Sequence, residues 1–74
     1  MYFVQAGAYS RAEDAEQQRA KLVMLGLDAR VTEREQSGRT VYRVRVGPFE
    51  GRAEAEKAAA RIKALDLSAS VLTL

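Results

Sequence analysis

The sequence of 74 residues contains no cysteine and no histidine. Without cysteine there can be no disulfide, no thiolate metal site and no thiol catalysis. Without histidine the chain lacks the commonest general base, the commonest metal ligand and the usual proton-linked switch near neutral pH. No apolar run approaches the roughly 20 residues that a helix needs to span a bilayer. We therefore expect no cofactor, no metal and no membrane contact by this chain.

The nucleophiles and acids that remain form no catalytic pattern. Catalysis would need a carboxylate pair or an activated Ser, Lys or Tyr in a pocket. No serine or threonine has a base at a recognisable spacing, and the chain has no Gly-rich phosphate loop and no metal-ligand spacing. We predict that the protein is not an enzyme.

The chain repeats itself with an offset of forty residues. When residues 1–34 are laid over residues 41–74, ten of the 34 pairs are identical. The identical pairs are Tyr2/Tyr42, Val4/Val44, Gly7/Gly47, Ala15/Ala55, Glu16/Glu56, Ala20/Ala60, Leu25/Leu65, Leu27/Leu67, Ala29/Ala69 and Val31/Val71. Self-similarity at a fixed period indicates copies of one supersecondary unit. Two copies are too few for a solenoid, so we predict one compact domain with internal pseudo-twofold symmetry.

Each copy has the pattern of a strand, an Ala-rich helix and a second strand. The alternation of apolar and polar residues predicts strands at 2–8, 27–35, 40–46 and 68–74, and helical spacing predicts helices at 11–25 and 52–65. Ser10 and Glu13 have the spacing of an N-terminal capping box. Gly7 is interpreted as a corner glycine, and Gly47 and Pro48 are predicted to end the third strand.

The order of these elements predicts an α+β, ferredoxin-like or RNP-type βαββαβ fold. In this fold a four-stranded antiparallel sheet has the order 4-1-3-2, and both crossovers place their helices on one face. We expect Val4 and Val44 of the sheet to pack against Leu22 and Ile62 of the helices. Residues 1–74 are expected to form a single, monomeric domain.

The sheet face away from the helices is predicted to be open and basic. The first and third strands are neighbours at the centre of the sheet. Phe3 and Gln5 should therefore lie beside Val41, Arg43 and Arg45 on that face.

Charge is separated between the two sides of the predicted fold. Arg30 and Arg34 extend the basic face along the second strand. The acidic residues of the helices collect in their opening turns, where negative charge favours the helix dipole: Glu13, Asp14, Glu16, Glu54 and Glu56. Guanidinium groups bind carboxylates and phosphates through a planar fork of donors. We interpret the basic face as a binding surface and the helical carboxylates as capping and solubility residues.

Two motifs in combination resemble the SPOR domain. The first is YFVQAGAYS at 2–10, followed by Ala15-Glu16 and Leu22. The second is YRVRVGPF at 42–49, followed by the Ala-Glu-Ala run at 53–55. The resemblance covers residues 2–74.

The resemblance implies a fold and a function. SPOR domains resemble ribonucleoprotein folds and bind bacterial peptidoglycan, with a preference for glycan strands stripped of stem peptides. It implies a non-catalytic module whose partner is the glycan strand and not a nucleic acid. The resemblance implies a location in the bacterial cell envelope, in the periplasm at the division septum. It also implies that the parent protein acts in cell division or cell-wall remodelling. The chain would then be a domain excised from a longer envelope protein.

The resemblance also transfers residue by residue onto the open sheet face. Gln5 occupies a glutamine position used for glycan contact, and Arg43 occupies an arginine position of the third strand. Ala8 stands where relatives often have serine, and Val41 where some have tryptophan. Val71 matches an apolar position of the fourth strand, although the repeat pairs it with core-facing Val31. The expected glycan-binding residues are Phe3, Gln5, Ala8, Val41, Arg43, Arg45 and Val71.

Two other functions are possible on the same fold. A single-stranded RNA-binding domain of the RRM type would need paired aromatic residues on the third strand to stack bases, where this chain has Val41, Arg43 and Arg45. A protein-interaction or regulatory domain is the other alternative, because sheet faces and edges also bind peptides. Fold alone does not decide among these functions.

Overall fold

A computed structural model describes residues 1–73 as one sheet and two helices. The elements are β1 (Tyr2–Tyr9), α1 (Ala12–Met24), β2 (Ala29–Gln36), β3 (Arg39–Phe49), α2 (Arg52–Lys63) and β4 (Ser70–Thr73). The strand order is β2-β3-β1-β4 and every neighbouring pair is antiparallel. This is the predicted order read from the other edge, so the βαββαβ prediction is confirmed. Leu74, the last residue of the predicted fourth strand, lies outside the described residues.

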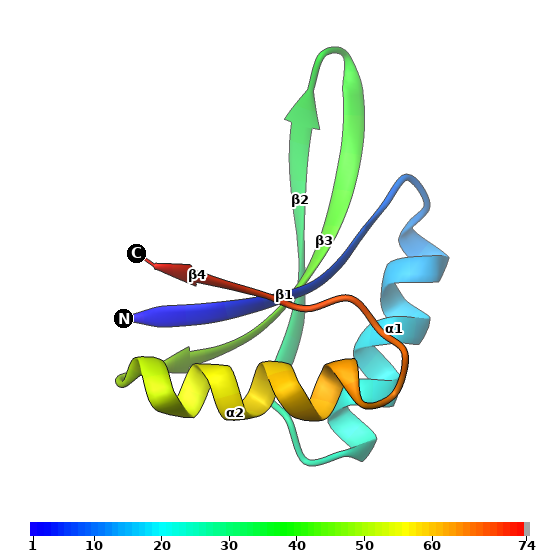
Figure 1. The fold of residues 1–74 in the computed structure, drawn as a ribbon. Helices are drawn as coiled ribbons and strands as arrows, with labels where there is room; N and C mark the ends of the chain where they lie inside the picture. Colours follow the sequence, from blue (N-terminus) through cyan, green and yellow to red (C-terminus); the bar gives the residue numbers. More distant parts are fainter. Residues whose placement is uncertain (74) are drawn as a thin grey trace.

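Both helices cover the same face of the sheet (Figure 1). Val4 and Val44 from the two central strands and Leu22 and Ile62 from the helices are fully buried together, as predicted. Alanines make up most of the remaining helical contribution to the core, and their small side chains let the helices approach the sheet closely. A core this thin leaves little margin, because truncating a buried residue such as Ile62 to alanine typically costs about 2–5 kcal/mol.

Gly7 and Gly47 lie inside strands, which corrects the sequence-based interpretation of both as corner or strand-ending residues. The β1–β3 register shifts by one residue between Gln5 and Ala8 and again between Val46 and Phe49. Each shift brackets one of the two glycines, whose φ angles are +143° and +134°. An extra residue in one strand opposite a single residue of its partner is a β-bulge, which bends the strand without ending it.

The third strand accordingly runs three residues further than predicted, through Pro48 to Phe49. Pro48 lacks the N–H of a central ladder position, but β2 begins at Ala29, opposite Val46. The Gly47 N–H still donates to the Asp28 carbonyl at 3.2 Å, just before β2 begins. Beyond Gly47 that side of β3 is a free edge, and the edge beside a bulge is where proline is tolerated in a sheet. The prediction that Gly47 and Pro48 end this strand is wrong for this reason.

Helix α1 does not begin with the predicted capping box. Arg11 occupies the N-cap position without a capping side-chain hydrogen bond, and its guanidinium instead donates to the Glu13 carboxylate at 2.8 Å. Inside the helix, Gln18 is buried and its Nε2 donates to the Ala6 carbonyl at 3.2 Å. That carbonyl lies in the stretch of β1 where the bulge interrupts the ladder. Gln18 therefore supplies a hydrogen bond to the backbone next to the bulge.

The β2–β3 hairpin extends well beyond the part of the sheet that the helices cover (Figure 1). Its strands are joined by Ser37 and Gly38 alone, between the paired residues Gln36 and Arg39. Both linking residues have positive φ, 52° and 78°, as a two-residue type I′ turn requires.

The first and last strands are neighbours. Tyr2 of β1 lies opposite Thr73 of β4, and three further pairs follow down to Gln5 and Ser70. The two ends of the chain therefore leave the sheet side by side (Figure 1).

Candidate functional site

A row of four side chains crosses the sheet on the face that the helices leave open. Gln5 pairs with Arg45 at the centre, and these two pair outward with Ser70 and Arg30. Opposed residues of antiparallel strands project from the same face, and the adjacent Val46 points into the core. With strands about 4.8 Å apart, three steps make the row about 14 Å long. That length suits an extended ligand lying across the strands.

Two further groups lie on either side of this central row. On one side, Arg43 pairs with Ala8 of β1 and with Thr32 of β2, and Val41 pairs with Arg34. These residues belong to the same alternation as Arg45, so they share its face.

On the other side of the row, Phe3 of β1 pairs with Leu72 of β4. A Cβ atom added to Gly47 would lie 3.2 Å from the Phe3 ring, so this ring rests directly on the glycine of the β3 bulge. The bulge thus gives the Phe3 ring a flat backbone platform, and Gly47 is the residue that allows so close an approach.

The arginines of the open face differ from those of the helices in their partners. Arg11 at the N-cap of α1, Arg19 within α1 and Arg52 of α2 each form an ion pair with a nearby glutamate. The remaining helical arginine, Arg61, donates to the Leu25 carbonyl. Within residues 1–73, neither Arg43 nor Arg45 forms an ion pair, although Arg30 lies 3.8 Å from Asp28.

Arg45 has a further unmet requirement. Its Nε atom is buried and has no acceptor among residues 1–73, and a buried donor without an acceptor costs free energy. Together with the missing ion pairs, this makes the centre of the face a cationic surface that the described protein does not neutralise. Such a surface is suited to carboxylate or phosphate groups of a ligand.

Six of the seven site residues predicted from the sequence lie on the open face, and one does not. Val71 pairs with buried Val4 and packs against the core, so it belongs to the helix-covered face. The repeat already indicated this placement, because it aligns Val71 with core-facing Val31. The open-face residues of β4 are instead Ser70 and Leu72, which sequence reasoning missed and which the alternation of this strand could have identified.

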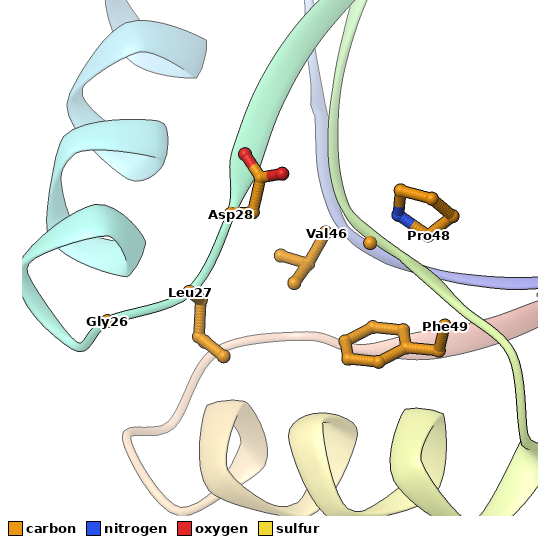
Figure 2. Close-up of a pocket in the computed structure, with 7 residues that line it drawn as sticks. Gly26, Leu27, Asp28, Val46, Pro48 and Phe49 are labelled. Atoms are coloured by element: carbon orange, nitrogen blue, oxygen red, sulfur yellow. The ribbon is translucent and has the colours of Figure 1, made fainter.

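Among residues 1–73, two hollows lie away from the central row of the open face. One, of about 260 Å³, is lined by Gly26, Leu27, Asp28, Val46, Gly47, Pro48 and Phe49. Figure 2 shows Leu27 and Phe49 pointing toward each other below Val46, with Asp28 turned away from them. The other, of about 310 Å³, is lined by Lys21, Met24, Leu25, Leu65 and Leu67. Both linings are mainly apolar and neither brings together a nucleophile and a base.

Two other features of the described chain bear on the sequence-based expectations. Residues 1–73 contain no group of three or more acidic, histidine or cysteine side chains placed to hold a metal ion. No helix among them has the length and apolar character needed to cross a membrane.

The fold and the exposed face define an RNP-type α+β domain with one open, cationic sheet face. The sequence pattern of the SPOR domain family matches residues 1–73, and the chain therefore belongs to the SPOR domain family. The crystal structure of the RlpA SPOR domain from Pseudomonas aeruginosa has the same fold, with a TM-score of 0.90 and 20% identity over the whole of both chains.

A second solved structure is more similar in sequence. It is the solution structure of the peptidoglycan binding domain of the B. subtilis cell wall lytic enzyme CwlC, which has a TM-score of 0.80 and 30% identity. The similarity covers 96% of this chain and 85% of that one. None of the curated proteins matches the chain in sequence.

Proposed function

We propose that this SPOR domain is a non-catalytic module that binds bacterial peptidoglycan through its open sheet face and prefers glycan strands stripped of stem peptides. The observation that carries the proposal is the arrangement of Arg43 and Arg45, which have no ion-pair partner among residues 1–73, next to Gln5 at the centre of an uncovered sheet. The similarity to the CwlC peptidoglycan binding domain supports the same ligand class.

The preference for stripped strands follows from the chemistry of the glycan. Removing the stem peptide frees the lactyl carboxylate of each muramic sugar and uncovers the sugar faces. A surface with free guanidinium groups then gains an anionic partner and loses a steric obstacle. The lactyl carboxylate supplies the negatively charged partner that Arg43 and Arg45 lack among residues 1–73.

The open face favours modest affinity in a single domain. Exposed ion pairs contribute about 0–1 kcal/mol each, and charged hydrogen bonds in buried sites contribute about 1.5–3 kcal/mol. Because Arg43 and Arg45 are half-buried, we expect each contact with a carboxylate to contribute a free energy between these two ranges. Several domains bound along one strand would then raise the overall affinity through effective concentration. We propose that the domain acts outside the cytoplasm, at the division septum, which is the location that membership of the SPOR family favours.

Sedimentation with purified sacculi tests the proposal. Sacculi treated with an amidase that removes stem peptides should bind more of the domain than intact sacculi, and added salt should lower the bound fraction in both cases. A single-stranded RNA competitor should have little effect at matched salt. Equal binding to treated and intact sacculi would contradict the preference, and stronger binding to RNA than to sacculi would favour an RNA-binding function.

A further inference from the structure

The internal repeat relates the two halves of the open face to each other. An offset of forty residues maps Gln5 onto Arg45, and these two residues are cross-strand partners. The pseudo-twofold axis therefore passes between them. The same offset maps Phe3 onto Arg43 and Arg30 onto Ser70, so each residue on one side of the axis has an equivalent on the other.

The strand pairing follows this pseudo-twofold symmetry, but the distribution of charged side chains does not. Strands β1 and β4 contain no charged residue at all. Every arginine of the face comes from the other two strands, β2 and β3. We call the residues Phe3, Gln5, Ser70 and Leu72 the neutral half, and the residues Arg30, Thr32, Arg43 and Arg45 the basic half.

The neutral half presents a fixed apolar surface. The Phe3 ring rests 3.2 Å from the Cβ position of Gly47 and lies opposite Leu72 on β4. An aromatic ring in this position offers apolar area with little loss of side-chain freedom. The flanking Gln5 and Ser70 add uncharged hydrogen-bonding groups. This chemistry suits the apolar face and the hydroxyl or amide groups of an uncharged sugar.

The basic half presents the opposite chemistry. Arg43 and Arg45 have no ion pair within residues 1–73, and the Nε of Arg45 is buried without an acceptor. The neighbouring Thr32, which pairs with Arg43, adds a hydroxyl group. A carboxylate bound here would accept charge-assisted hydrogen bonds.

We propose that the two halves bind different units of the glycan, with a carboxylate-bearing sugar over the basic half and an adjoining uncharged sugar over the neutral half. The proposal rests on the peptidoglycan-binding function above and adds to it the register of the ligand. A pseudosymmetric fold whose two halves differ in charge would in this way bind a polymer in which two different sugar units alternate.

The test is a pair of ligands that differ only in the carboxylate. One is a peptide-free glycan tetrasaccharide with free lactyl carboxylates, and the other is the same tetrasaccharide with those groups converted to uncharged amides. Isothermal titration should give an affinity about tenfold higher for the acid, which corresponds to about 1.4 kcal/mol. Backbone amide shifts should differ between the two complexes at Thr32 and Arg43 and should agree at Phe3 and Leu72.

Variants in each half then separate the two roles. The Arg43→Gln, Arg45→Gln variant should bind the two ligands within about twofold of each other, because it lacks the two guanidinium groups that have no ion pair among residues 1–73, while the remaining Arg30 lies beside Asp28. The Phe3→Ala, Leu72→Ala variant should bind both ligands severalfold more weakly while keeping the tenfold preference for the acid. Each pair serves as the matched control for the other.

The outcomes distinguish the register from the function. If the wild-type domain binds the acid and the amide equally, or if the shifts that differ lie on the neutral half, the division of roles is wrong while glycan binding stands. If it binds neither ligand and also fails to sediment with treated sacculi, the proposed function fails as well. If a double variant does not fold, the comparison of backbone amide chemical shifts between the two wild-type complexes alone decides whether the halves have different roles.

Discussion

Gly7 and Gly47, forty residues apart, have similar positive φ angles, and an aromatic ring packs against each of them. Both lie at β-bulges with strongly positive φ. A Cβ atom would lie 2.7 Å from the ring of Tyr9 at Gly7 and 3.3 Å from the ring of Phe49 at Gly47. In each copy of the repeat, an aromatic residue two positions after the glycine therefore covers it. The Gly-x-aromatic motif builds a bulge, and not a corner, in both central strands.

Alanine at the two glycines should have different consequences for binding. Either change forces an L-residue to positive φ, which typically costs about 1–3 kcal/mol. At Gly47 the new methyl group would also push against the Phe3 ring and shift it on the open face, so Gly47→Ala should weaken glycan binding beyond its effect on stability. Gly7→Ala should displace Tyr9, which packs against the core. Urea unfolding and sacculus sedimentation of both variants check this, and equal binding defects at equal stability would contradict it.

A second pair of equivalent positions predicts a stabilising change. Gly26 and Asp66 follow the two helices at matching places in the repeat, with φ of +83° and +60°. Asp66→Gly should raise the free energy of unfolding by a few tenths to about 1 kcal/mol, because glycine adopts this conformation without a Cβ clash. Gly26→Ala should lower it by about 1 kcal/mol through backbone strain alone, since no atom lies within 4 Å of its Cβ position. Chemical denaturation measures both, and destabilisation by Asp66→Gly would refute the first expectation.

A negative charge at the centre of the open face should weaken glycan binding. Gln5→Glu would place a carboxylate opposite Arg45, where it would form the ion pair that the ligand otherwise supplies. We expect a loss of severalfold or more in affinity, with the melting temperature almost unchanged because the side chain is only half-buried. Glu16→Gln and Glu56→Gln on the helices, which pair with Arg19 and Arg52, are the controls and should bind like wild type. A folded Gln5→Glu variant with wild-type affinity would remove Gln5 from the site.

Stability should fall at alkaline pH through Tyr9. Burial raises the pKa of the Tyr9 phenol, and the Asp14 carboxylate adds to the rise. A raised native pKa means that this stability is fully present below the ordinary value of about 10 and is lost as pH increases through the native pKa. Tyr9→Phe should therefore lose less stability than wild type between pH 9 and pH 11.5 in urea unfolding. Asp14→Asn should show an intermediate loss, and identical pH profiles for all three proteins would contradict this assignment.

Much of the fold could be predicted because the repeat and the alternation of side chains agree. Each copy predicts the same elements, and the buried Val4 and Val44 fall on the strand positions that alternation selects. The bulges could not be predicted from the alternation of apolar and polar residues. The extra residue at each bulge, near Gly7 or Gly47, changes the strand register, but it adds no polar residue at an apolar position that would reveal the change. The start of α1 was also missed, since Ser10 has a capping sequence but the chain turns into the helix at Arg11.

The open face could be located from the sequence, but its composition could be predicted only in part. Arginines at alternate positions of the third strand were enough to place Arg43 and Arg45 together. The choice between Val71 and Leu72 depended on which face of a four-residue edge strand is covered, and the pairing with Val4 settles it. Gln18 is a polar residue on the buried face of its helix. The sequence does not explain why it is buried there, but the structure does, because its side chain donates a hydrogen bond to the Ala6 carbonyl.

The pairing of the first and last strands has a mechanical consequence. A force that pulls residues 2 and 73 apart would load the four pairs between β1 and β4 one after another, beginning with Tyr2 and Thr73 and ending with Gln5 and Ser70. Two strands that separate in this geometry need only a small force, because the residue pairs break one at a time and each pair carries the whole force in turn. Leu72 and Ser70 would leave the open face first, while Arg30, Arg43 and Arg45 stay in place on β2 and β3. Tension along the chain would thus dismantle the uncharged side of the surface before the charged side.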